Sequence, residues 1–494
     1  MTSTDRVDLF ISTGDAMLYE NLADDLAEQI QTGTFRPGER MPSVRQLAEQ
    51  QNVSVSTAVS AYQTLEAQGL INPRPKSGFY VSLPTRSKVQ APAPTQGLKP
   101  TQLNMSDTIA EIFRKTRRPD YVHFDLAVPH PQYQPATQLK AATNRVVRHQ
   151  FEKSLQLSPS PGDLDLRRLI AQRMATQGSQ LAPDDIVITN GCQEAILISL
   201  QAITTPGDVV AVEMPCYYGF LQALESLGLK VVSVATDPIT GLDVDALKKV
   251  AQRWPVKVCL CSPNFSNPTG GQLSQEQRQT ILLLAKEFDF FIIEDDIFGE
   301  LAHDGSSGQT LLATANQLAR KNRRHADLVA KVIYCSAFSK SLSPGLRLGW
   351  VVAGELRLRV MERQRAATTG TTSLIQLQVA DYLKSGHFDK HLARVRREYQ
   401  RNVSRSLQVI AEAFPAGTQA TQPKGGFVLW LSLPKTGVDA SQLFQRALAH
   451  NICFVPGEVF GLAGLQHCLR LSVAQPWTDE LDLALRQLGS LAHN

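Results

Sequence analysis

Long apolar runs are absent from this 494-residue sequence. No stretch approaches the roughly 18 consecutive apolar residues that a membrane-spanning helix needs. The first ten residues also lack the apolar segment of a signal peptide. We therefore expect a protein that has no membrane partner and is located in the cytoplasm.

Cysteine is sparse, and neither sign of charge is in large excess. The seven cysteines are odd in number, and Cys259 and Cys261 have no second pair at the spacing of a metal site. We expect reduced thiols in a protein core and no metal centre. The net charge of +4 is small for this length, so the charge of the whole chain does not indicate a nucleic-acid partner.

The length and composition predict a multidomain globular protein. With 43% hydrophobic and 19% charged residues, the chain can bury sizeable cores, and its length predicts two or three domains. A boundary is indicated between residues 82 and 102, where Pro84, Pro92, Pro94 and Pro100 favour an extended chain. We therefore expect domains at residues 1–82 and 121–494, joined by a basic linker and docking segment at residues 83–120.

The first domain has the pattern of three helices followed by a hairpin. The apolar face of the first helix is formed by Leu18, Leu22, Leu26 and Ile30. Ser43 and Gln46 form a capping box at the start of the second helix. A third helix is expected from near Ser54 to Gly69, with a buried side made of Val55, Val59, Tyr62 and Leu65. A hairpin with a basic, glycine-containing tip then extends to Val81.

Helix, turn, helix and basic wing together predict a winged helix-turn-helix, whose recognition helix enters the major groove of DNA. The blocks RPGERMPSVRQLAEQQNVS, AYQTLEAQGLI and RPKSGFYV resemble the GntR family. The resemblance implies phosphate contacts from Arg45, Arg74 and Lys76. It also implies that short polar side chains of the third helix face double-stranded operator DNA, namely Ser54, Ser56, Thr57 and Ser60.

Two alternatives remain open for this half of the chain. The helix-turn-helix serves either as a DNA reader or only as a protein interface. The bases of the linker, Arg86, Lys88 and Lys99, either add non-specific DNA contacts or belong to a simple tether.

Beyond residue 120, apolar strand-like runs alternate with longer helical patterns, which predicts an α/β domain with a largely parallel sheet. The expected strands are Ile186–Thr189, Val209–Glu213, Lys230–Val234, Val258–Cys261, Phe290–Glu294 and Val332–Cys335. Ligands of such sheets bind at the carboxyl ends of the strands.

Residues that would suit pyridoxal 5'-phosphate (PLP) follow these strands. Lys340 supplies an amine for a Schiff base, and Asp295 can keep the pyridine nitrogen protonated. Phosphate donors are expected from Ser339, Arg347 and the helix start at Gly191, Cys192 and Gln193. An amide that can bond the ring hydroxyl is expected from Asn264 or Asn267. Tyr217 is expected to stack on the ring, and Arg470 to bind a substrate carboxylate with its forked guanidinium.

The motifs NPTG, EDD and SKSLSPGLRLG, in this order, resemble fold-type I aminotransferases along residues 121–494. With the GntR-like module in front, the chain resembles the MocR subfamily of PLP-binding regulators. The resemblance implies a homodimer, PLP bound to Lys340, and a smaller C-terminal α+β subdomain at roughly residues 371–494.

Three positions depart from the aminotransferase pattern by losing a hydroxyl. Phe298 and Ala337 replace a tyrosine and a Ser or Thr near the cofactor, and Leu157 replaces a tyrosine that reaches across the dimer in relatives. Each lost hydrogen bond to a charged group weakens that contact by roughly 1.5–3 kcal/mol. We expect PLP binding to survive and turnover to be weak at most.

Two functions are therefore considered. The first is a transcription regulator that senses an amino compound or PLP itself through the aminotransferase-like domain. The alternative is a working PLP-dependent aminotransferase with an appended DNA-binding domain. A scaffold without PLP is disfavoured because Lys340, Asp295 and Arg347 are all retained.

Overall fold

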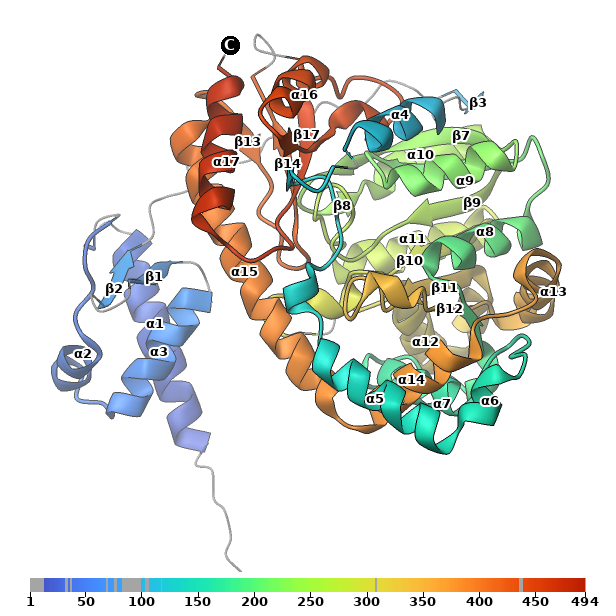
Figure 1. The fold of residues 1–494 in the computed structure, drawn as a ribbon, viewed down its shortest axis with the longest axis horizontal. Coiled ribbons are helices and arrows are strands. Elements are labelled where there is room, and N and C mark those ends of the chain that lie inside the picture. The colour runs from blue at the N-terminus through green and yellow to red at the C-terminus, as the bar shows by residue number, and fades with distance from the viewer. Residues whose placement is uncertain are drawn as a thin grey trace, which may run out of the picture. The chain divides into compact units, whose positions relative to one another are not determined.

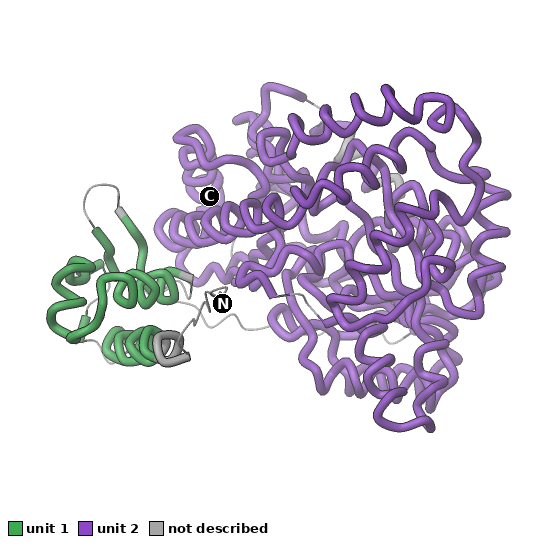
Figure 2. The backbone as a smooth tube through the Cα atoms, turned by 90° about the horizontal axis from the view of Figure 1, so that it is seen from below, with its two compact units in different colours: residues 1–86 green, residues 87–494 purple. Residues whose placement is uncertain are grey.

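The computed structural model divides the chain into two compact units, residues 1–86 (unit 1) and residues 87–494 (unit 2), which Figure 2 colours separately. The structure describes residues 13–31, 34–35, 38–67, 70–74, 78–81, 99–102, 106–116, 118–306, 309–434 and 439–493. Within these ranges no helix combines the length and the apolar character that a membrane crossing requires.

Unit 1 is a three-helix module with a two-stranded wing. Its elements are α1 (Thr13–Gln31), α2 (Val44–Gln50), α3 (Val55–Ala67), β1 (Ile71–Arg74) and β2 (Gly78–Val81). The strands pair antiparallel. Tyr62 links α3 to the segment before α2 and to β2. Its hydroxyl donates to the Pro42 carbonyl over 2.7 Å, and its ring lies 4.9 Å from that of Phe79.

The second helix begins as predicted. The Gln46 amide donates to Ser43 Oγ over 3.3 Å, and the Ser43 amide donates to Gln46 Oε1 over 3.0 Å. This capping box satisfies two amides that the first turn of a helix leaves open. Gly69 and most of the predicted linker lie outside the described residues.

The predicted apolar faces of α1 and α3 are partly wrong. Leu18, Val55 and Val59 are 48%, 52% and 36% exposed. Ala58 and Ala61 take the inward positions of α3 beside Tyr62 and Leu65, because small side chains let α3 pack closely against α1. The valines therefore lie on the outer face of α3.

Unit 2 contains a large mixed sheet with the strand order β3-β7-β6-β9-β10-β11-β12-β5. Pairing is parallel from β7 to β11 and antiparallel at β3, β12 and β5. The predicted strands are confirmed to within a few residues at their ends. They are β5 (Ile186–Thr189), β6 (Val209–Met214), β7 (Lys230–Asp237), β9 (Val256–Cys261), β10 (Phe291–Asp295) and β11 (Val332–Ala337). Strand β12 (Gly349–Val352) was not predicted from the sequence.

Alternate residues of the strands point into two apolar layers. One layer holds Val210, Leu260 and Ile333, and the other holds Ala211, Cys259 and Val332. Helices therefore cover both faces of the sheet (Figure 1). One face is covered by α8 (Cys192–Ile203), α9 (Tyr218–Ser226) and α13 (Arg357–Thr368), and the other by α7 (Leu164–Thr176), α10 (Val244–Arg253), α11 (Gln275–Glu287) and α12 (Leu311–Lys321).

The C-terminal part of unit 2 has its own antiparallel sheet, in the order β13-β14-β17-β16. Its elements are β13 (Gln419–Ala420), β14 (Val428–Ser432), β16 (Val455–Pro456) and β17 (Cys468–Ser472), with the helices α15 (His387–Ala413), α16 (Ala440–Ala449) and α17 (Asp479–Leu491). On α4 (Ser106–Thr116), Ile109 is buried in a cluster with Trp430 and Phe460, so this helix docks onto that sheet.

Unit 2 contains further α-helices and strands. They are β3 (Thr101–Gln102), β4 (Val122–His123), α5 (Ala136–His149), α6 (Phe151–Leu155), β8 (Gly241–Leu242), α14 (Ser373–Lys384) and β15 (Ile452–Cys453). Of these, α5 and α14 contribute to one of its core clusters. Strands β4 and β15 form a short parallel pair.

Gly349, at the start of β12, packs closely against the backbone at the start of α8. A Cβ there would lie 2.7 Å from the Ser336 carbonyl oxygen and 2.7–2.8 Å from the backbone of Gly191. Because these neighbours are backbone atoms, they cannot move aside as a side chain does. Glycine is therefore required at this position.

We predict that Gly349→Ala lowers the unfolding free energy of unit 2 by about 1–3 kcal/mol, the usual cost of overpacking. The control is Gly345→Ala, because a Cβ at Gly345 would meet only Ser343 Oγ, at 3.8 Å. Denaturant unfolding followed by tryptophan fluorescence measures the difference, since Trp254, Trp350, Trp430 and Trp477 all lie in unit 2. Equal midpoints for the two variants would contradict the prediction.

Candidate functional site

Lys340 lies just beyond β11, with its amine facing the interior of unit 2. Nζ donates to the Ala127 carbonyl over 2.5 Å and lies 6.0 Å from the centre of the Phe298 ring. Burial, together with the positive charges of Arg470 and Arg347, lowers the pKa of Lys340 to about 8. The amine is therefore far closer to neutrality at physiological pH than an ordinary lysine.

Asp295 ends β10 on the neighbouring strand. Its Oδ1 accepts from the Cys192 thiol over 3.2 Å and from the Ile297 amide over 3.1 Å. Burial raises the pKa of Asp295 to about 6. A buried carboxylate of this kind gains stability from any cationic group placed against it.

The start of α8 and Arg347 form a cradle for an anion. Gly191 caps α8 with φ +95°, and Arg347 Nη2 donates to the Asn190 carbonyl over 3.1 Å. A Cβ on Gly191 would lie 2.8 Å from that Nη2, so glycine lets the guanidinium approach the open amides of the helix. Such a helix start attracts phosphate or carboxylate. Ser339 is buried directly before Lys340.

The side chains of Gln193 and Tyr217 both lie close to Gly219. Gln193 Nε2 donates to the Gly219 carbonyl over 2.8 Å. A Cβ on Gly219 would lie 2.3 Å from the Tyr217 ring and 2.6 Å from Gln193 Oε1. Among the described residues Gln193 Oε1 is buried without a hydrogen-bond partner. Because Gly219 has no side chain, the ring of Tyr217 and the acceptor Gln193 Oε1 can lie side by side.

Arg470 on β17 is almost fully buried. Nη1 donates to Asn267 Oδ1 over 3.3 Å, Nη2 donates to the Asp125 carbonyl, and the guanidinium lies 5.4 Å from the centre of the Phe460 ring. Its Nε has no partner among the described residues. Burial lowers the pKa of Arg470. The predicted residues Asn267 and Arg470 therefore lie in contact.

Sequence reasoning missed the groups that face the two buried cations. They are the backbone carbonyls of Asp125 and Ala127 and the ring of Phe460. A backbone carbonyl leaves no trace in residue type, so no sequence pattern marks it. Only the chain path after β4 brings these carbonyls to Arg470 and Lys340.

The three departures from the aminotransferase pattern occupy different environments. Phe298 is buried and packs edge-on against Phe427, with ring centres 5.2 Å apart. Ala337 is buried in β11, whereas Leu157 is 72% exposed. Positions 298 and 337 therefore lie inside unit 2, and position 157 lies on its surface.

Asn264, in the same motif region as Asn267, takes part in a separate network. Its Nδ2 donates to Asp296 Oδ1 over 2.8 Å, and Arg278 Nη2 donates to its Oδ1 over 2.7 Å. The Tyr334 hydroxyl donates to Asp296 Oδ2 over 2.9 Å. This network supplies hydrogen bonds to a buried carboxylate beside Asp295.

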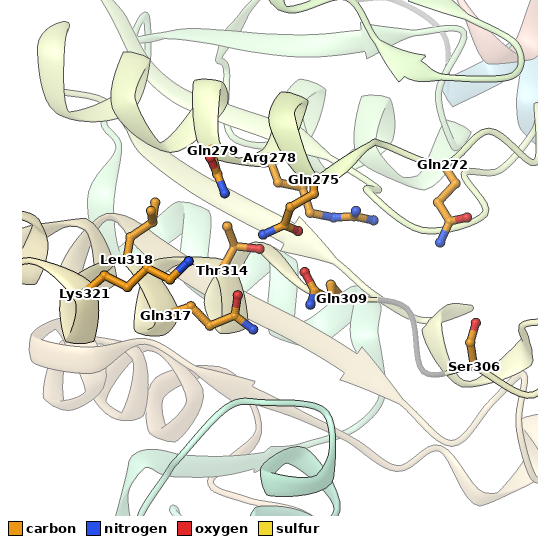
Figure 3. Close-up of a pocket in the computed structure, with 10 residues that line it drawn as sticks. All are labelled: Gln272, Gln275, Arg278, Gln279, Ser306, Gln309, Thr314, Gln317, Leu318 and Lys321. Atoms are coloured by element: carbon orange, nitrogen blue, oxygen red, sulfur yellow. The ribbon is translucent and has the colours of Figure 1, made fainter. Parts of the chain in front are cut away.

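A polar cavity of about 530 Å³ lies between α11 and α12, and Figure 3 shows the side chains that line it. The lining residues are Gln272, Gln275, Arg278, Gln279, Ser306, Gln309, Thr314, Gln317, Leu318 and Lys321. None of these described residues belongs to the Lys340 site. The cavity is therefore distinct from the candidate cofactor site.

In unit 1 the predicted DNA-facing residues differ in how exposed they are. Arg45 and Ser56 are exposed and Ser60 is half-buried. Ser54 Oγ lies 2.7 Å from Ser56 Oγ and from Thr57 Oγ1, and it accepts from the Thr57 amide over 3.0 Å. The side chain of Arg74 and all of Lys76 lie outside the described residues.

Thr57 is less exposed than the other described residues predicted to face DNA, and its place at the DNA surface stays a prediction. Its side chain is only 8% exposed. Because its hydroxyl is tied to Ser54 at the start of α3, Thr57 faces inward and stabilises the first turn of the helix.

Two family models match the chain. Residues 18–81 match the bacterial regulatory proteins of the gntR family, and residues 123–488 match aminotransferase class I and II. The uncharacterized HTH-type transcriptional regulators YjiR and YdcR of Escherichia coli (strain K12) are 35% and 37% identical, over 96% of this chain and 98% of each relative.

A solved structure supports the assignment of unit 2. The chain resembles the α-aminoadipate aminotransferase LysN from Thermus thermophilus with a TM-score of 0.70 and 30% identity, over 79% of this chain and 98% of that one. The chain therefore belongs to the MocR-type family of transcriptional regulators, in which a GntR DNA-binding domain is joined to a PLP-dependent domain of the aminotransferase class I and II family.

Proposed function

We propose that unit 2 senses an amino compound, or PLP itself, and that this event controls how unit 1 binds operator DNA. The observation that carries the proposal is the cluster of Lys340, Asp295, Arg347 and Arg470 in a chain that also holds a GntR module. Loss of the hydroxyls at positions 298, 337 and 157 favours binding of an amine over rapid turnover.

The residues of the site fit PLP. The cradle of Arg347 and the α8 amides suits the phosphate, and Asp295 suits a protonated ring nitrogen. Asn267 accepts from Arg470 through Oδ1, which leaves its amide hydrogens for the ring hydroxyl. Tyr217 is the stacking ring. When bound, PLP supplies an electrophilic carbon that reacts with amines.

Arg470 is the proposed partner of the effector's carboxylate. An amino acid that reaches both Arg470 and the Lys340 region competes with the carbonyls of Asp125 and Ala127 for these cations. Those residues follow the linker and α4 in the chain. We infer that their displacement acts on unit 1 through the covalent chain, and the coupling between effector and DNA must be reciprocal.

A homodimer is part of the proposal. Apolar side chains are exposed together along α6, the following loop and the start of α7, namely Phe151, Leu155, Leu157 and Leu164. An exposed apolar patch of this kind marks a protein interface. A two-fold dimer would present two copies of unit 1 to two operator half-sites.

A working aminotransferase is the second candidate, favoured by the similarity of unit 2 to LysN and by 33% identity to the 2-aminoadipate transaminase of Thermus thermophilus over 78% of this chain and 93% of that relative. The two candidates differ in what happens after an amine binds. A sensor retains it, whereas an enzyme converts it and releases a keto acid.

PLP attachment is predicted to depend on pH through Lys340. With a pKa of about 8, roughly one-tenth of the amine is neutral at pH 7, against about one part in three thousand for an ordinary lysine. The initial rate should rise about tenfold between pH 6 and pH 7 and level off above pH 8. Mass spectrometry after borohydride reduction measures it, with Lys340→Ala as the control that gains no adduct. A rate still rising steeply at pH 10 would contradict the assignment.

DNA binding is predicted to fall steeply with salt, with a contribution from Arg45. Arg45→Ala should weaken binding to the protein's own promoter DNA and reduce the slope of log affinity against log salt by about one. The matched control is Arg323→Ala, an exposed arginine of unit 2 that should leave the slope unchanged. An unchanged slope for Arg45→Ala would remove Arg45 from the interface.

Single-turnover reactions separate the sensor from the enzyme. The PLP-loaded protein, mixed with a panel of amino acids, should shift its absorption spectrum with at least one of them and then stall without stoichiometric keto acid. Complete conversion to pyridoxamine phosphate, followed by many turnovers when a keto acid is added, would establish the second candidate instead.

A further inference from the structure

The outer face of α3 carries two exposed valines one helical turn apart. Val55 is 52% exposed and Val59 is 36% exposed, whereas Ala58, Ala61 and Tyr62 are completely buried. Side chains at positions i and i+4 lie next to each other on a helix. The valines therefore form one continuous apolar pair, which packing within unit 1 does not explain.

The polar groups next to this pair are largely engaged with each other. Ser54 Oγ lies 2.7 Å from both Ser56 Oγ and Thr57 Oγ1, where it caps the helix. From position 54 to position 63 the sequence SVSTAVSAYQ contains no charged residue. The methyl groups of the two valines are therefore the main chemistry that the N-terminal half of α3 offers to a partner.

This chemistry suits one base of the major groove. A guanine is read by arginine or lysine, and an adenine by asparagine or glutamine. A thymine presents a C5-methyl group that apolar side chains contact. The first two turns of α3 hold no arginine or lysine, which excludes a bidentate contact to guanine from them. Gln63, which is exposed two turns after Ser56, remains available to contact an adenine.

We propose that Val55 and Val59 read thymine C5-methyl groups in the operator, so that this part of each half-site is specified by apolar contact. The inference rests on the proposed function, since it takes α3 as the helix that enters the major groove. The short serines around the valines allow the helix to approach the base edges closely. Phosphate contacts from residues such as Arg45 then supply affinity without sequence preference.

The test compares thymine with uracil, which lacks only the C5-methyl group. Full-length protein first selects duplexes from a randomised pool. Each thymine of an enriched half-site is then replaced by uracil, one at a time, and dissociation constants are measured for wild type, Val55→Ala and Val59→Ala. Alanine favours helix, so the variants keep α3. The control is Leu18→Ala, a similarly exposed apolar residue on α1.

Wild type should lose about fourfold in affinity at one or two thymines, the effect of one buried methyl group. Val55→Ala or Val59→Ala should bind the thymine duplex more weakly and lose the response to uracil at one of those positions. Leu18→Ala should behave as wild type. If wild type binds an enriched duplex but uracil changes nothing at any position, the inference is overturned while DNA binding stands. If no duplex is enriched, both are overturned.

Discussion

The buried amine of Lys340 is the constraint on which unit 2 depends. At this depth an ammonium loses its hydration, and the charges of Arg470 and Arg347 disfavour it further. The ends of β10 and β11 and the start of β12 have to lie together to create that environment. Asp295 comes from the end of β10, Lys340 follows β11, and the close contact of Gly349 in β12 with Gly191 sets the start of α8 beside Arg347.

Neutral backbone carbonyls face both buried cations of the site. Ala127 accepts from Lys340 and Asp125 accepts from Arg470 through main-chain oxygens. A carboxylate in either place would bind its cation more strongly, since charge-assisted hydrogen bonds are roughly twice as strong as neutral ones. The present partners are therefore ones that an incoming carboxylate can replace, which suits a site that has to respond to a ligand.

The sequence predicts the fold well where the physical signal is local. Runs such as Ile186–Thr189 and Val332–Ala337 are apolar throughout because both faces of a central strand are buried. The capping box of Ser43 and Gln46 is equally local. The antiparallel strand β12 was missed because the short run Gly349–Val352 directly follows the motif that carries Arg347 and has no turn residues to set it apart.

Other features depend on contacts between distant segments, and the sequence could not reveal them. The periodicity of α3 is compatible with more than one buried face, and Ala58 and Ala61 decide it by packing against α1. Thr57 faces inward because Ser54 binds its hydroxyl. The residue types of Lys340, Asp295 and Arg470 indicated a cofactor site, but their partners at residues 125 and 127 became visible only in the folded chain.

The most direct measurement is the affinity of the full-length protein for an operator duplex at fixed salt, with PLP and with PLP plus each member of a panel of amino acids. For a sensor, at least one addition changes the affinity of wild type by about 5–150-fold, the usual range of allosteric coupling. The same addition leaves Lys340→Ala unchanged. Equal affinities under all conditions, or the same change in Lys340→Ala, would contradict the coupling of the lysine site to DNA.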